Sequence, residues 1–202
     1  MNKSLAGIAG MVALLAGMVG ADMKGTLKLG KDDSGISFAY KARVPFSKVM
    51  EAVSGRVPGK ITWMAMENID GYLFHMATVT QDDRTQKVVT VDSGSGMIIS
   101  VEPLVEKKKE EKEKKKVKAA FIGSLNAGDA AKVEYPFMAK ISLEKAMAIA
   151  VNKHPGRFYE VYIYEENGFI FYGIEIAIKG KKHLLKVDVD AGNGRIVNKE
   201  AM

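Results

Sequence analysis

Two spacings of apolar residues alternate along the chain. Apolar side chains at every second position predict half-buried strands at about 36–42 and at about 133–137. The spacing then changes to i, i+3, i+4 and i+7, which predicts one amphipathic helix from Phe46 and another from Leu143. Ser142 is placed to cap the second helix. A Pro-Gly pair follows each helix and ends it, because proline cannot continue the hydrogen-bond ladder.

A hairpin signal follows each predicted helix. Asp70-Gly71 and Asn167-Gly168 favour the positive φ angles of a type I′ turn between two strands. The second turn sets Tyr164 opposite Phe171, and a last strand is predicted at about 184–190. Each unit is therefore expected to be α+β: a strand, a helix and a three-stranded antiparallel meander, with the helix packed on one face of the sheet.

The same landmarks occur twice. The Pro-Gly pairs begin at 58 and 155, which is 97 residues apart, and the closing turns begin with Asp92 and Asp190, 98 residues apart. A drift of one residue is tolerated in a loop but not in a strand, where it would turn every side chain to the other face. We therefore expect two repeated modules, at residues 22–102 and 133–202.

The remaining segments predict export and a solvated linker. Residues 1–21 resemble a signal peptide, with Lys3 ahead of an apolar run and small residues before a cleavage site after Ala21; an uncleaved membrane anchor is the alternative. We therefore expect a periplasmic or secreted protein. Residues 103–132 form the predicted linker, because Glu106 to Lys118 holds eight lysines and four glutamates. The interleaved glutamates argue against nucleic-acid binding, although the chain carries a net charge of +6.

Neither catalytic nor metal-site motifs stand out. The chain has no cysteine, and its three histidines are not expected to converge, so we predict no enzyme and no cofactor. The run from Asp188 to Gly194 resembles the start of a calcium loop but lacks its later ligands, and an aspartate capping its own turn explains Asp190 better. Met64, Met66 and His75 fall on one face of the first hairpin and are weak candidates for copper; core packing is the alternative.

The second hairpin carries aromatic residues on the face that its own helix does not use. These residues are Tyr162, Tyr164, Phe169 and Phe171. A large aromatic surface of this kind is typical of an interface, so we expect these four side chains to bind either the first module or an outside partner. The alternative is that the polypeptide between Lys118 and Lys132 covers them.

These segments resemble the PepSY domain, named for the propeptides of thermolysin-like peptidases and related bacterial spore proteins. In the second module the resemblance rests on "KISLEKAMAIAVNKHPG", "YEVYIYEENGFIFYGIEIAI" and "LLKVDVDAGNGRIV"; in the first it rests more loosely on "VPFSKVMEAVSGRVPG" and "VVTVDSGSGMIISVE". The resemblance implies an exported, non-enzymatic module that acts through protein contacts, as an inhibitor or regulator of a peptidase or of an envelope assembly. The expected partner is another envelope or extracellular protein. The alternative is a small-ligand or metal-binding accessory protein of an envelope sensor or redox system.

Overall fold

The computed structural model describes residues 24–104 and 123–202. The predicted signal peptide at 1–21 and the charged run at 106–118 lie outside the described residues. Within the described parts, no helix is long and apolar enough to cross a membrane.

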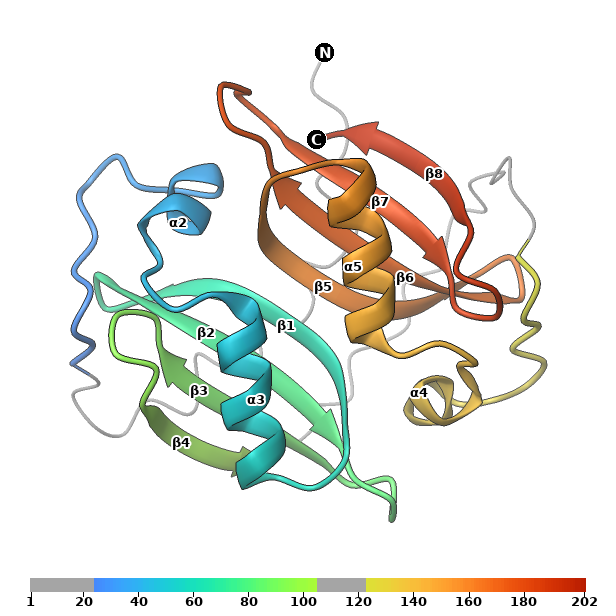
Figure 1. Cartoon of the computed structure of the whole chain (residues 1–202). Coiled ribbons are helices and arrows are strands. Elements are labelled where there is room, and N and C mark those ends of the chain that lie inside the picture. The colour runs from blue at the N-terminus through green and yellow to red at the C-terminus, as the bar shows by residue number, and fades with distance from the viewer. Residues whose placement is uncertain (1–23, 105–122) are drawn as a thin grey trace, which may run out of the picture.

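One antiparallel sheet of eight strands forms the body of the protein, so the predicted α+β class is confirmed (Figure 1). The strand order is β4-β3-β2-β1-β5-β6-β7-β8. The strands of the first half are β1 (Lys60–Ile69), β2 (Tyr72–Thr80), β3 (Gln86–Asp92) and β4 (Ile98–Pro103). Those of the second half are β5 (Arg157–Glu166), β6 (Phe169–Ala177), β7 (Leu184–Asp190) and β8 (Ile196–Ala201).

The two halves meet where β1 pairs with β5, a junction that we call the seam. Three residue pairs define its register: Trp63 with Tyr162, Met64 with Val161, and Ala65 with Glu160. Each half also has a fourth strand, β4 or β8, which the expected three-stranded meander lacked. The halves therefore share a single sheet rather than each closing its own.

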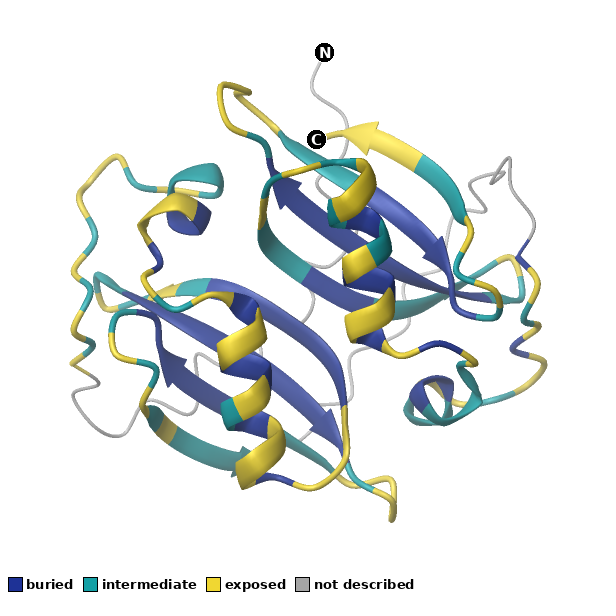
Figure 2. Ribbon diagram, in the orientation of Figure 1, coloured by how far each residue is buried: buried dark blue, intermediate teal, exposed yellow. Residues whose placement is uncertain are grey.

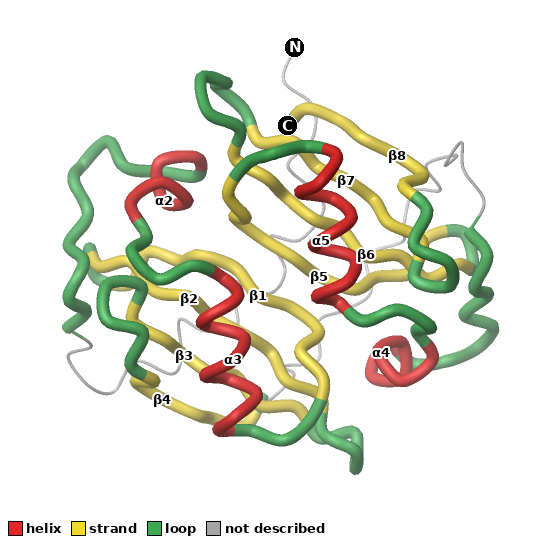
Figure 3. The backbone as a smooth tube through the Cα atoms, viewed as in Figure 1, coloured by secondary structure: helices red, strands yellow, loops and turns green. Residues whose placement is uncertain are grey.

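The helices α3 (Phe46–Arg56) and α5 (Leu143–Lys153) lie on the same face of this sheet (Figure 3). As predicted, the Ser142 side chain accepts a hydrogen bond from the backbone N–H of Lys145, at 3.2 Å, and so caps α5. Each helix turns an apolar stripe towards the sheet, and burial of each large side chain contributes roughly 1.5–3 kcal/mol. The main core lies between the helices and the sheet, where Figure 2 shows the buried strands.

The predicted strands at 36–42 and 133–137 are wrong. The first segment is the short helix α2 (Ile36–Lys41), and the second contains a 3₁₀ turn (Lys132–Glu134) and α4 (Tyr135–Met138). In α2 the adjacent residues Phe38 and Ala39 are both buried, as a helix allows and an alternating strand does not. In α4, Pro136 stands at a helix start, where its missing N–H costs nothing.

Both predicted hairpin turns are confirmed. Asp70 and Asn167 each adopt a φ of 51°, and the glycines that follow them have φ of 81° and 82°. The predicted register is also observed, with Tyr164 opposite Phe171 and Met66 opposite His75.

The closing turns hold an earlier part of the chain against the sheet. Asp190 accepts a hydrogen bond from Gly192 in its own turn, as predicted, and also accepts from the backbone N–H and the hydroxyl of Ser124. Asp92 does the same with Ser95 and with Thr26, which lies 98 residues before Ser124. Residues 123–132 therefore pack on the second half, and the expected linker of 103–132 is too long at this end.

Candidate functional site

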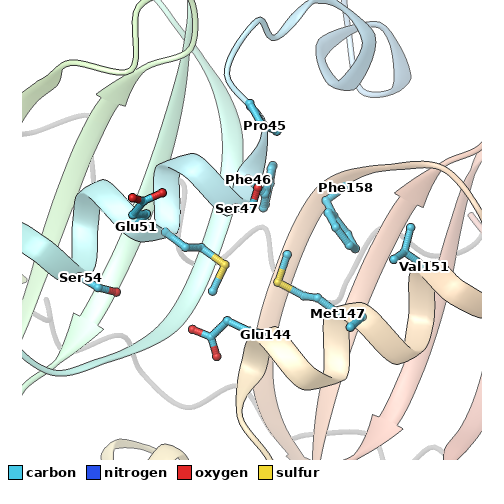
Figure 4. A pocket seen from close by; sticks show the side chains of 11 residues that line it. Pro45, Phe46, Ser47, Glu51, Ser54, Glu144, Met147, Val151 and Phe158 are labelled. Atoms are coloured by element: carbon cyan, nitrogen blue, oxygen red, sulfur yellow. The ribbon is translucent and has the colours of Figure 1, made fainter.

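A groove of about 470 Å³ runs between α3 and α5 and crosses the seam (Figure 4). It opens on the helix-bearing face of the sheet. Side chains from both halves line it: Pro45, Phe46, Ser47, Met50, Glu51, Ser54, Glu144, Met147, Ala148, Val151 and Phe158.

Aromatic and thioether side chains form most of the apolar lining. The rings of Phe46, from the start of α3, and Phe158, from β5, have centroids 5.9 Å apart and tilt by 47°. Met147 projects from α5 towards the first half (Figure 4). Met50 on α3 contributes a second thioether to the lining. Methionine side chains are flexible and polarisable, and they adapt to apolar partners of different shapes. The groove can therefore bind apolar groups of different shapes.

Polar side chains occupy the rim of the groove. The Glu51 carboxylate pairs with Lys48 at 2.7 Å on the exposed side of α3, and the hydrogen bond from Lys48 lowers the pKa of Glu51. Glu144 lies in the first turn of α5, where a carboxylate is favoured by the helix dipole. The lining holds neither histidine nor cysteine. The groove therefore offers an apolar surface for contact, with carboxylates at its rim.

The four aromatic residues predicted to bind a partner do not form an open surface. Tyr162 is 7% exposed and Phe171 is fully buried, whereas Tyr164 and Phe169 are half-buried. Tyr162 and Phe171 are therefore not open to an outside partner, and Tyr162 packs in a cluster with Trp63 of the first half.

Chain packing explains this burial. The backbone of Gly123 lies so close that a Cβ atom there would come within 2.7 Å of both Phe169 and Phe171, and Ile170 donates a hydrogen bond to the carbonyl of Leu125 at 2.9 Å. The described residues 123–132 thus cover Phe169 and Phe171, as in the alternative in which the polypeptide before the second module covers the aromatic face. Tyr162 instead fills the space that Gly173 leaves on the neighbouring strand, where a Cβ atom would lie 2.3 Å from its ring.

The candidate copper ligands lie in the core beneath α3, outside the groove lining. Met64, Met66 and His75 are at most 2% exposed. His75 Nδ1 lies 2.7 Å from the Ser93 hydroxyl, and the ring meets Phe46 edge-on at 5.2 Å. Desolvation lowers the pKa of His75 to about 4, so the ring is neutral at pH 7. Among the described residues, no three His, Cys, Asp or Glu side chains are grouped so that they could hold a metal ion.

The groove residues were not singled out from the sequence. Phe46, Met50 and Met147 belong to stripes that read as ordinary helix core, and Phe158 follows a helix stop. No local pattern shows that β1 pairs with β5, and this pairing is what brings the two helices side by side.

Comparison with known proteins identifies one family. Two solved structures show limited similarity. One is a candidate lipoprotein from Clostridium difficile 630, with 15% sequence identity and a TM-score of 0.41; the alignment covers 80% of this chain and 95% of the lipoprotein chain. The other is the C-terminal domain of YpeB from Bacillus megaterium, with 11% sequence identity and a TM-score of 0.28; the alignment covers 88% of this chain and 69% of the YpeB chain. A search of curated proteins finds no significant match. The family model "Peptidase propeptide and YPEB domain" matches residues 140–200, so this part of the chain, from the start of α5 through β8, is a PepSY domain.

Proposed function

We propose that this protein is an exported, non-enzymatic binding module whose groove between α3 and α5 holds an apolar segment of another envelope or extracellular protein. The observation that carries the proposal is the groove itself, because Phe46, Met50, Met147 and Phe158 gather there from both halves. Buried aromatic and methionine side chains are enriched at the centres of protein interfaces. A peptidase, or a component of an envelope assembly, is the proposed partner, and inhibition or regulation is the proposed outcome.

The arrangement of the two halves supports a further part of the proposal: residues 24–104 form a second, more divergent PepSY-type unit. Both halves tie a serine or threonine to the aspartate of the closing turn, and these residues are 98 positions apart in each case. Both halves also place one long helix over four strands in the same order. On this proposal, the groove exists because two such units join through β1 and β5.

Site-directed crosslinking tests the proposed site. A photoreactive residue in place of Ser54, on the groove rim, is expected to capture the partner from envelope extract, whereas one at Lys181, in the exposed turn before β7, is not. Binding of the identified partner is then measured with purified proteins. Ala148→Glu places a charge in the groove from an exposed helix position and should weaken binding at least tenfold. Asn152→Glu, an exposed position on the same helix, is the matched control.

Two results would contradict the proposal. One is equal binding by the Ala148→Glu and Asn152→Glu variants while both keep the wild-type thermal transition. The other is capture at Lys181 that equals capture at Ser54.

A second candidate function is binding of a small apolar ligand, as expected of an accessory protein in an envelope sensor or redox system. The groove volume of about 470 Å³ favours it, because small-molecule sites usually enclose about 300–1,000 Å³. Native mass spectrometry of the purified protein would show a constant added mass that is lost in the Ala148→Glu variant. If no added mass is found and the crosslinked species is a protein, the first function is supported.

A further inference from the structure

Ionisable side chains line up across the sheet face opposite α3 and α5, which we call the rear face. Glu160 on β5 lies opposite Ala65 on β1 and opposite Glu175 on β6. Glu175 in turn lies opposite Lys186 on β7, and Lys186 lies opposite Glu200 on β8. Since side chains alternate between faces along a strand, this register places the row on one side of the sheet.

Glu160 and Glu175 form an unfavourable pair if both are ionised. They are direct neighbours across antiparallel strands, where like charges destabilise the sheet. Glu175 is only 6% exposed, so water screens the repulsion poorly. Lys186 is one positive group beside the pair, and it also contacts Asp188 at 3.3 Å and Glu200 at 3.6 Å. One lysine shared in this way cannot neutralise both carboxylates.

The pair is connected to the first half by a hydrogen bond across the seam. The indole N–H of Trp63, on β1, donates to Glu160 Oε1 at 2.7 Å. Trp63 is the single tryptophan of the chain, and it is 4% exposed. Because the indole can only donate, it favours a charged acceptor at Glu160, and a proton shared by the pair then resides mainly on Glu175.

Other groups on the rear face make loss of a proton more costly. Glu67 lies two residues beyond Ala65 on β1, and burial followed by the charge of Glu160 raises the pKa of Glu67 to about 7. Burial, again followed by Glu160, raises the pKa of Glu175 to about 8. Burial also raises the pKa of Glu160, against the lowering effect of the Trp63 bond. The remaining ionisable groups that face the pair are Tyr159 and Tyr162 on β5, Lys186 and Asp188 on β7, and Glu200 on β8.

We propose that the Glu160–Glu175 pair, with Glu67 beside it, retains at least one proton at neutral pH, and that release of this proton weakens the seam between the two halves. The seam has only three register pairs, and the carboxyl groups lie directly on it or one strand away. The consequence is a joint that tightens as the surroundings acidify. An exported protein meets such changes in pH directly.

The direction of the effect follows from proton binding. A carboxyl group whose pKa is higher in the folded than in the unfolded protein binds protons more tightly when folded. Its stabilising effect is complete below the ordinary glutamate pKa and is lost as pH rises through 7 to 8. As pH rises, the equilibrium constant for unfolding should therefore increase by up to about tenfold per pH unit for each proton that the folded protein releases on unfolding.

Two measurements on the full chain test the proposal. The urea midpoint is compared at pH 5.5, 7.0 and 8.5 for the wild type, Glu175→Gln and the control Asp129→Asn, which changes an exposed carboxylate away from the rear face. The wild-type and control midpoints should fall as pH rises. Glutamine imitates the protonated acid, so Glu175→Gln should show a smaller fall and a higher midpoint at pH 8.5.

The second measurement is the emission of Trp63 in the folded protein between pH 5.5 and 9. A titration with a midpoint near 7 to 8 is expected in the wild type and should be lost in Glu160→Gln, which keeps an oxygen acceptor for the indole. Wild-type Trp63 emission that stays constant over this range would overturn the proposal, even if the glutamine variants failed to fold. An unchanged pH slope in a folded Glu175→Gln variant would overturn it as well.

Discussion

Removing the charge of Asp190 should destabilise the second half more than its place in a surface turn suggests. The carboxylate is 2% exposed and accepts three hydrogen bonds: from the Ser124 N–H at 2.6 Å, the Ser124 hydroxyl at 2.9 Å and the Gly192 N–H at 2.7 Å. A bond to a charged acceptor contributes about 1.5–3 kcal/mol, and a neutral one about 0.5–1.5 kcal/mol. Asparagine keeps only one acceptor oxygen, so Asp190→Asn weakens two of these bonds by about 1 kcal/mol each and removes the third, which is worth about 2 kcal/mol on this scale; we expect a loss of about 4 kcal/mol.

Urea unfolding at pH 7, followed by circular dichroism, measures this loss. Asp129→Asn is the matched control, because it removes the same charge from an exposed position in the segment that Asp190 holds. A double-mutant cycle with Ser124→Ala should return a coupling of about 1 kcal/mol, as expected for residues in direct contact. The reasoning is refuted if Asp190→Asn costs no more than Asp129→Asn, or if its cost is the same with and without the Ser124 hydroxyl.

The structure leads to three further predictions. His75 should oppose the pH dependence of the carboxyl pair: its pKa of about 4 lies below the ordinary 6.5, so its contribution to stability falls as pH drops from 6.5 through 4, and in a pH series of urea midpoints His75→Gln should gain more stability on acidification over this range than the wild type. Phe171→Ser should cost at least about 3 kcal/mol, because the ring is fully buried, and a variant as stable as wild type in thermal melts would contradict the core assignment. A fragment of residues 123–202 should unfold at a higher urea concentration than one of residues 133–202, because only the longer fragment keeps Ser124; equal midpoints would exclude a structural role for this segment.

Local chemistry made much of each half predictable from the sequence. Asp70-Gly71 and Asn167-Gly168 determine their turns through backbone conformation alone, and once a two-residue turn is fixed, the register of the hairpin follows. Helix α5 was similarly predictable, because Ser142 begins it and a Pro-Gly pair follows it.

What could not be predicted depends on contacts between distant segments. The alternation at Ile36, Phe38 and Tyr40 suits a strand, yet the segment forms α2 and packs against β5 and β6 of the other half. The burial of Phe171 depends on Gly123, which lies 48 residues earlier and outside the expected module. The groove has the same origin, because Phe46 and Phe158 meet only after β1 has paired with β5. The Thr26 and Ser124 pair was accessible in principle, since it repeats the 98-residue spacing of Asp92 and Asp190.

The pairing of β1 with β5 also determines how two copies of this chain can interact. Separated from each other, β1 and β5 would each become an exposed sheet edge, and unpaired edges readily recruit strands from other chains. The complementary strand on a second copy is identical to the one that was lost, so the first half of one chain can pair with the second half of another. Such domain swapping needs the three register pairs of the seam to open, together with the other contacts between the halves, such as those of Phe46 with Phe158, Tyr40 with Ala177 and Arg84 with Glu134, while both four-stranded units stay folded. A monomer that is stable at low concentration and an exchanged dimer that forms at high concentration would then contain the same contacts.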